Sequence, residues 1–128
     1  MISKFVSPKA LIHEGVIIGK NVNVFANCEI FGGTIIEDNV VIGYPSQESQ
    51  ILIKQDIGEA SIEYQTYYDK KIVHTTLVQE NCIIRSNSVI YEGAYIHDNF
   101  DCGHNVIIRE FTTIGRSSFV YPNILLMR

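Results

Sequence analysis

The stretch Ile84–Gly115 reads IRSNSVIYEGAYIHDNFDCGHNVIIREFTTIG, and an aliphatic or cysteine side chain recurs in it at every sixth residue. The recurring positions are Ile84, Ile90, Ile96, Cys102, Ile108 and Ile114. The fourth residue after most of them is small or β-branched. A helix repeats about every 3.6 residues and a strand about every two, so a strict period of six is neither alone. The stretch therefore predicts a short strand and a turn, repeated along the chain.

The same period runs outward through most of the sequence. It covers residues 6–47 and resumes over residues 72–128, with turn residues such as Gly19-Lys20-Asn21 between the aliphatic positions. Between the two runs the sixth positions hold Glu48, Lys54, Ala60 and Thr66, which are poor core residues. We therefore predict one domain, residues 1–128, with an insertion at about residues 44–71. Alternation around Ile51–Ile53 and 61–64, with Gly58 between them, suggests that the insertion is a projecting hairpin.

Composition excludes several classes of protein. The 128 residues are 46% hydrophobic and 19% charged, so one domain can bury a core. The net charge is -4 and no Lys/Arg run occurs, which argues against nucleic acid as a partner. No apolar stretch approaches the length of a membrane span and no signal peptide is visible, so we expect no membrane association and a cytoplasmic location. The three cysteines are odd in number and are not closely paired in the sequence, so we expect neither a disulfide framework nor a zinc site.

The repeat resembles that of the hexapeptide-repeat, or isoleucine-patch, acyltransferase family, and the stretch around CGHNVIIRE (102–110) is most similar to bacterial and archaeal sugar N- or O-acetyltransferases. The resemblance implies an all-β fold, a left-handed parallel β-helix whose triangular coils contain three hexads each. The repeats would fill about five to six coils with one inserted loop or hairpin. Because strands of such a coil stack, each residue would lie over the residue 18 positions earlier.

The resemblance also implies a function. Family members transfer an acetyl or short acyl group from acetyl-CoA to an amino or hydroxyl group of a sugar, here expected to be nucleotide-linked. Their catalytic histidine has the hexad phase of His104, which makes His104 the expected general base and Asn105 its catalytic neighbour. A neutral imidazole can take the proton that the acceptor loses as it attacks the thioester. We expect acetyl-CoA as co-substrate, no bound cofactor and no metal. Asp101, Glu110 or a carbonyl of a neighbouring subunit could orient the imidazole.

Stacking of the coils provides candidate substrate-binding residues. One coil before His104 lie Arg85, Ser86, Asn87 and Tyr91, on the side where family members hold the acceptor. Arg109 and Glu110 complete the predicted set. Guanidinium groups bind phosphate well, so Arg85 and Arg109 could hold the phosphates of a nucleotide-linked sugar.

Two other functions stay open at this stage. A metal site like that of the γ-class carbonic anhydrases, which share this fold, needs two histidines five residues apart, whereas His97 and His104 are seven apart. A non-catalytic or truncated trimer that acts as a scaffold is the stronger alternative, since little more than one coil of sequence follows His104. Outward-facing Phe25, Phe31, Tyr95 and Phe119 suggest apolar faces that a homotrimer would cover, unless these aromatics lie at corners or over the insertion.

Overall fold

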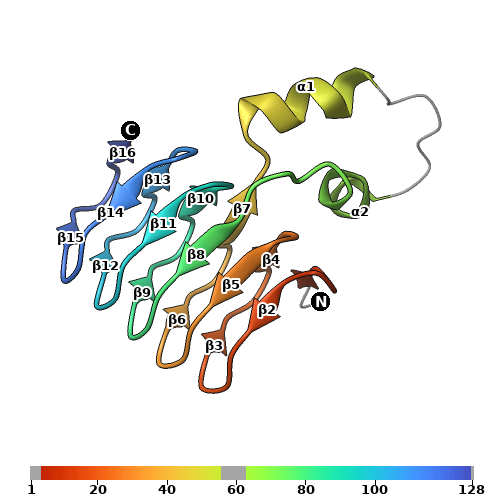
Figure 1. The fold of residues 1–128 in the computed structure, drawn as a ribbon. Coiled ribbons are helices and arrows are strands. Elements are labelled where there is room, and N and C mark those ends of the chain that lie inside the picture. Colours follow the sequence, from red (N-terminus) through yellow and green to blue (C-terminus); the bar gives the residue numbers. More distant parts are fainter. Residues whose placement is uncertain (1–3, 56–62, 128) are drawn as a thin grey trace.

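In the computed structural model, which describes residues 4–55 and 63–127, short strands dominate the chain (Figure 1). In the first part they are β1 (Phe5–Val6), β2 (Leu11–Ile12), β3 (Ile17–Ile18), β4 (Asn23–Val24), β5 (Cys28–Ile30), β6 (Ile35–Ile36) and β7 (Val41–Tyr44). Two helices follow, α1 (Gln47–Gln55) and α2 (Tyr64–Asp69). The second part contains β8 (Thr76–Val78), β9 (Ile83–Ile84), β10 (Val89–Tyr91), β11 (Tyr95–Ile96), β12 (Asp101–Cys102), β13 (Ile107–Ile108), β14 (Thr113–Ile114), β15 (Phe119–Val120) and β16 (Leu125–Leu126).

The strands form three parallel sheets, one for each side of a triangular prism. Sheet A has the order β1-β4-β7-β10-β13-β16, sheet B runs from β2 to β14 and sheet C from β3 to β15. Val89 pairs with Ile107, so the register advances 18 residues per coil, as predicted. The described strands make five full coils and one further strand of a left-handed β-helix, which confirms the predicted fold class.

The recurring aliphatic positions fill the interior of the prism. Ile30, Ile36, Ile84, Ile96 and Ile108 are at most 1% exposed, and Cys102 takes one place in the same series. Each such side chain contributes about 1.5–3 kcal/mol when it is fully buried, so the repeat itself supplies the core. The other interior column is small or β-branched, apart from Phe100, which the prism also buries.

Asparagine sets the conformation of most corners. The backbone φ angle is positive at eight of the nine asparagines: Asn21, Asn27, Asn39, Asn81, Asn87, Asn99, Asn105 and Asn123. Asparagine tolerates the left-handed region better than other non-glycine residues, because its short side chain bonds locally. Phe111 and Ser117 have positive φ at equivalent corner positions, where neither side chain offers that advantage.

The insertion leaves the prism between β7 and β8, and the hairpin prediction for it is wrong. Residues Ile51–Ile53 belong to α1, and Tyr64 begins α2; Gly58 and Ser61 lie outside the described residues. The buried residues of α1 are Ser49 and Ile53, four positions apart on one helical face. A short apolar run is compatible with the period of a strand and with that of a helix. Here the contacts of the segment with the prism stabilise the helix.

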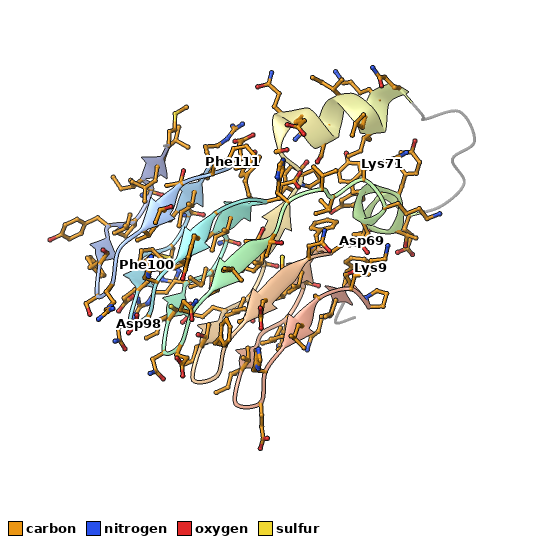
Figure 2. All side chains as sticks on the ribbon, in the orientation of Figure 1. Lys9, Asp69, Lys71, Asp98, Phe100 and Phe111 are labelled. Carbon is orange, nitrogen blue, oxygen red and sulfur yellow. The ribbon has the colours of Figure 1, made fainter. Side chains whose placement is uncertain are left out.

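Helix α2 covers the first coils. The Asp69 carboxylate accepts hydrogen bonds from Ser7 Oγ at 2.6 Å and from the Ala26 amide at 2.7 Å. Tyr68 lies over Phe25, and Figure 2 shows Asp69 close to the first coils. Phe25 is only 1% exposed because the insertion covers it, so of the two positions considered for it, the one under the insertion is correct and the one facing a partner subunit is wrong.

Candidate functional site

His104 lies at the apex of the turn Gly103–Val106, which joins β12 to β13 at the corner between sheets C and A. Its side chain is exposed, and no described residue hydrogen-bonds to its imidazole. The turn itself is held tightly. The Asn105 amide donates to the Ser86 carbonyl at 3.1 Å, and the His104 carbonyl accepts from the Asn123 amide at 3.0 Å. The corner therefore presents a free imidazole on a fixed backbone.

Asn105 follows at a φ of 58°, which gives it the same conformational role as the other corner asparagines. Pro122 lies on the other side of Gly103. A Cβ atom at Gly103 would come within 2.6 Å of the Pro122 ring, so only glycine fits between the two coils there. Ser86, a predicted neighbour, and Pro122 thus flank the turn from the coils on either side.

Three predicted substrate-binding residues share this corner, and two of them already have partners. The Ser86 amide and hydroxyl both donate to Glu37 Oε1 at 3.2 Å. Arg85 pairs with the Asp101 carboxylate and donates to the Cys102 carbonyl at 3.1 Å. Asn87 is exposed. Sequence reasoning missed Glu37. Across the insertion, paired residues of β6 and β9 are 48 positions apart, and Glu37 lies 48 positions before Arg85, so the two occupy equivalent places on adjacent coils.

The carboxylates considered for orienting His104 point elsewhere. Asp101 pairs with Arg85, and Glu110 bonds to Arg109 and to the Gln47 amide at the start of α1. Within the described residues neither carboxylate contacts the imidazole.

The other three predicted residues lie together at a different corner, between sheets A and B. The Arg109 guanidinium lies 4.3 Å from the centre of the Tyr91 ring, and Arg109 Nε donates to Glu110 Oε1 at 2.7 Å. Burial alone would raise the pKa of Glu110, but the hydrogen bonds from Arg109 and the Gln47 amide lower it to about 2. Arg109, Glu110 and Phe111 line a cavity of about 360 Å³ together with the start of α1 and Met127.

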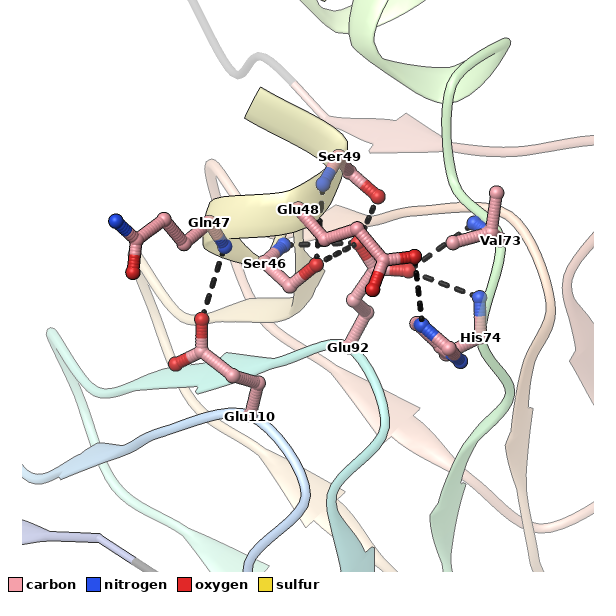
Figure 3. Close-up of polar contacts among 8 residues, drawn as sticks. All are labelled: Ser46, Gln47, Glu48, Ser49, Val73, His74, Glu92 and Glu110. Atoms are coloured by element: carbon pink, nitrogen blue, oxygen red, sulfur yellow. Dashed lines mark hydrogen bonds and ion pairs between the residues drawn. The ribbon is translucent and has the colours of Figure 1, made fainter. Parts of the chain in front are cut away.

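A buried carboxylate that sequence reasoning missed holds the insertion at this second corner (Figure 3). Glu92 is 0% exposed and accepts hydrogen bonds from the Ser46 amide and hydroxyl, from Ser49 Oγ, and from the amides of Val73 and His74. Burial alone would raise the pKa of Glu92, but these hydrogen bonds lower it overall. One side chain thus binds both ends of the insertion.

His74 belongs to this second corner, not to the His104 turn. Its ring packs edge-on against Phe111, with centroids 4.7 Å apart, and Nε2 lies 3.5 Å from Glu48 Oε1. Figure 2 shows Phe111 on the side from which the insertion leaves the prism. One feature of the sequence could have revealed part of this corner: Ser46-Gln47-Glu48 has the residue types of a helix start. In the structure Ser46 Oγ accepts a hydrogen bond from the Ser49 amide, as the side chain of an N-cap residue does.

The described residues contain no group of three or more histidine, cysteine or acidic side chains placed to hold a metal ion. All three cysteines are buried, and burial raises the pKa of Cys28 to about 12. They pack the interior.

No described helix combines the length and apolar character needed to span a bilayer.

The left-handed β-helix defines the structural class of the chain. No family model and no curated protein matches its sequence. Among solved structures, the chain is similar to the acetyltransferase domain of PglB from Neisseria gonorrhoeae FA1090, with a TM-score of 0.52 and 16% sequence identity. The match covers 98% of this chain and 50% of that chain, so this protein spans about half the length of its structural relative. At this identity the likeness establishes the fold.

Proposed function

We propose that this protein is an acyltransferase that moves an acetyl or short acyl group from acetyl-CoA to an amino or hydroxyl group of a nucleotide-linked sugar, with His104 as general base. The observation that carries the proposal is the exposed imidazole at a rigid corner, free of internal hydrogen bonds. The likeness in fold to an acetyltransferase domain supports the same reaction class.

In the proposed reaction the acceptor nitrogen or oxygen attacks the thioester carbonyl carbon, and the imidazole of His104 takes the proton that the acceptor loses. The tetrahedral intermediate then collapses and the C–S bond breaks, and the leaving thiolate of coenzyme A takes the proton from the His104 imidazolium, which restores the base. An unpaired imidazole suits this role, because no internal partner competes for the nitrogen that must accept the proton.

The remaining predicted residues would act in two groups. Ser86, Asn87 and Arg85 border His104 and are proposed to contact the sugar, and Asn105 would act by fixing the turn. Tyr91, Arg109 and Glu110 are proposed to contact the nucleotide end of the acceptor. Both arginines already pair with carboxylates, so a phosphate must compete with Asp101 or Glu110 for them.

We further propose a cytoplasmic homotrimer whose subunits meet along the faces beside His104. Sheets C and A flank this corner and expose apolar side chains: Ile17 (62%) and Phe119 (53%) on sheet C, and Leu125 (55%) on sheet A. A ring of three subunits would cover such faces and could supply the carbonyl that orients His104.

An assay of coenzyme A release tests the proposal. Purified protein is incubated with acetyl-CoA and a panel of nucleotide-linked and free amino sugars, and the free thiol and the acetylated product are both measured. We expect turnover with at least one amino sugar. Absence of an acetylated product across the panel would contradict the proposed acceptor class.

A non-catalytic scaffold is the second candidate, because both carboxylates that could orient His104 are engaged elsewhere in the single chain. Calorimetric titration with acetyl-CoA separates the two functions. A stable trimer that does not bind acetyl-CoA favours the scaffold, whereas binding favours the transferase.

A further inference from the structure

Ser88 lies inside the prism, directly beneath the turn that carries His104. It is 1% exposed. Its hydroxyl accepts a hydrogen bond from the Val106 amide at 3.1 Å and donates to the Gly103 carbonyl at 3.4 Å. A hydroxyl can do both at once, and here it joins the first and last residues of the four-residue turn.

The contact matters because the turn ends inside the core. Val106 is 0% exposed, so without the hydroxyl its amide would be buried with no acceptor. An unsatisfied buried donor is costly, so the turn would shift to recover a partner. His104 stands at the apex of that turn, and any such shift would be passed to its imidazole.

Among the described residues the same arrangement occurs once more, beneath the turn 79–82, whose residues differ from those of the His104 turn. Thr34 Oγ1 donates to the Gln79 carbonyl at 2.9 Å and accepts from the Cys82 amide at 3.1 Å. In that turn Asn81 has a φ of 58°, the value that Asn105 has beside His104. The residue at the apex is Glu80. The two turns therefore share their geometry and their internal hydroxyl, and differ in the side chain that they present.

We propose that Ser88 is a positioning residue for His104: its hydroxyl fixes the turn so that the imidazole stays aligned with the acceptor and the thioester. This inference rests on the proposed acyl transfer. Ser88 lies inside the prism and acts through the backbone, so it affects the rate of the chemical step and not the binding of either substrate. Misalignment of a reacting group by about 1 Å can cost about 100-fold in rate.

The test compares Ser88→Ala with Thr34→Val, which removes the equivalent hydroxyl from the other turn. For each variant kcat and KM are measured with acetyl-CoA and the amino sugar that the wild type acetylates fastest, and Tm is measured by calorimetry. Both variants should lose several degrees of Tm, because each leaves a buried amide unpaired. Only Ser88→Ala should lose about 10- to 100-fold in kcat, with KM nearly unchanged. Ser88→Thr, which restores the hydroxyl, should recover most of the wild-type kcat.

Three results would overturn the inference while leaving acyl transfer intact. They are an unchanged kcat in Ser88→Ala, an equal loss of kcat in Thr34→Val, and no recovery in a folded Ser88→Thr variant. An inactive wild type would instead remove the proposed function, and the inference with it. If Ser88→Ala does not fold, Ser88→Cys takes its place, because a thiol is a weaker donor and acceptor. The kcat of Ser88→Cys should be lower than that of the wild type, by less than the 10- to 100-fold loss expected when the hydrogen bonds are removed completely. A kcat equal to that of the wild type contradicts the proposal.

Discussion

Single residues at the corners determine whether each coil can close. Asparagine occupies most of the left-handed positions, and Ser117 occupies one of them at a φ of 57°. A residue other than glycine or asparagine pays about 1–2 kcal/mol there. We therefore expect Ser117→Asn to stabilise the protein by up to about 1 kcal/mol, and Ser117→Val to destabilise it. Urea denaturation of both variants tests this, and the opposite order of stabilities would contradict it.

Glu110 provides a pH test of the second corner. Its pKa is about 2 in the folded protein, below the value of 4.5 expected when unfolded, so its contribution to stability is complete above pH 4.5 and is lost as the pH falls toward 2. Glu110→Gln should therefore be less stable than the wild type at pH 7, and the two should converge near pH 2. Denaturation midpoints across this range measure the difference. A constant difference at every pH would exclude the carboxylate as its origin.

The residues near His104 show what sequence could predict at this scale. The period of six and the expected 18-residue coil correctly stacked Ser86 under His104 and Tyr91 under Arg109. They did not reveal which polar side chains pair. Arg85 with Asp101 and Ser86 with Glu37 depend on how side chains reach across coils, and one of these contacts crosses the insertion. The period also places Arg109 and Glu110 one strand beyond His104, at another corner, although all were assigned to one site.

At the scale of elements, the repeat determines the strands but not the insertion. Ser46, the residue before helix α1, has Glu92 among its partners, and Gln47, the first residue of the helix, donates its amide to Glu110 from the next coil. Both carboxylates are distant in sequence, so no local pattern could show that they favour a helix start over a strand. Negative charge at a helix N-terminus is favourable, and here two carboxylates from successive coils, those of Glu92 and Glu110, lie at the start of α1.

Removal of the Glu92 charge should loosen this attachment. Glu92→Gln replaces a carboxylate oxygen with an amide donor that faces other donors, so we expect a loss of about 1–3 kcal/mol. The control is Glu29→Gln, which removes a partly exposed pair with His13 and should cost less than about 1 kcal/mol. Urea denaturation compares the two, and limited proteolysis should cut the Glu92→Gln variant faster between β7 and β8. Equal stability of both variants would show that Glu92 does not anchor the insertion.

At the scale of the whole molecule, the prism is a regular β-helix in which two corners carry the candidate functional residues. One carries the exposed His104, and the other carries the insertion, the Arg109–Glu110 pair and a cavity. Strand β13 joins them along sheet A. Under the proposed function, an extended acceptor would be recognised at the second corner and acetylated at the first.

The turnover of His104→Ala tests the central claim most directly. With acetyl-CoA and the best amino-sugar acceptor, we expect kcat to fall by about 100- to 10,000-fold relative to the wild type, because the general base is removed. His97→Ala is the matched control, since His97 stacks on Tyr95 away from the His104 corner, and its kcat should equal that of the wild type. Sedimentation must show the same assembly for all three proteins. A His104→Ala variant that retains wild-type turnover would contradict the assignment of His104 as the base.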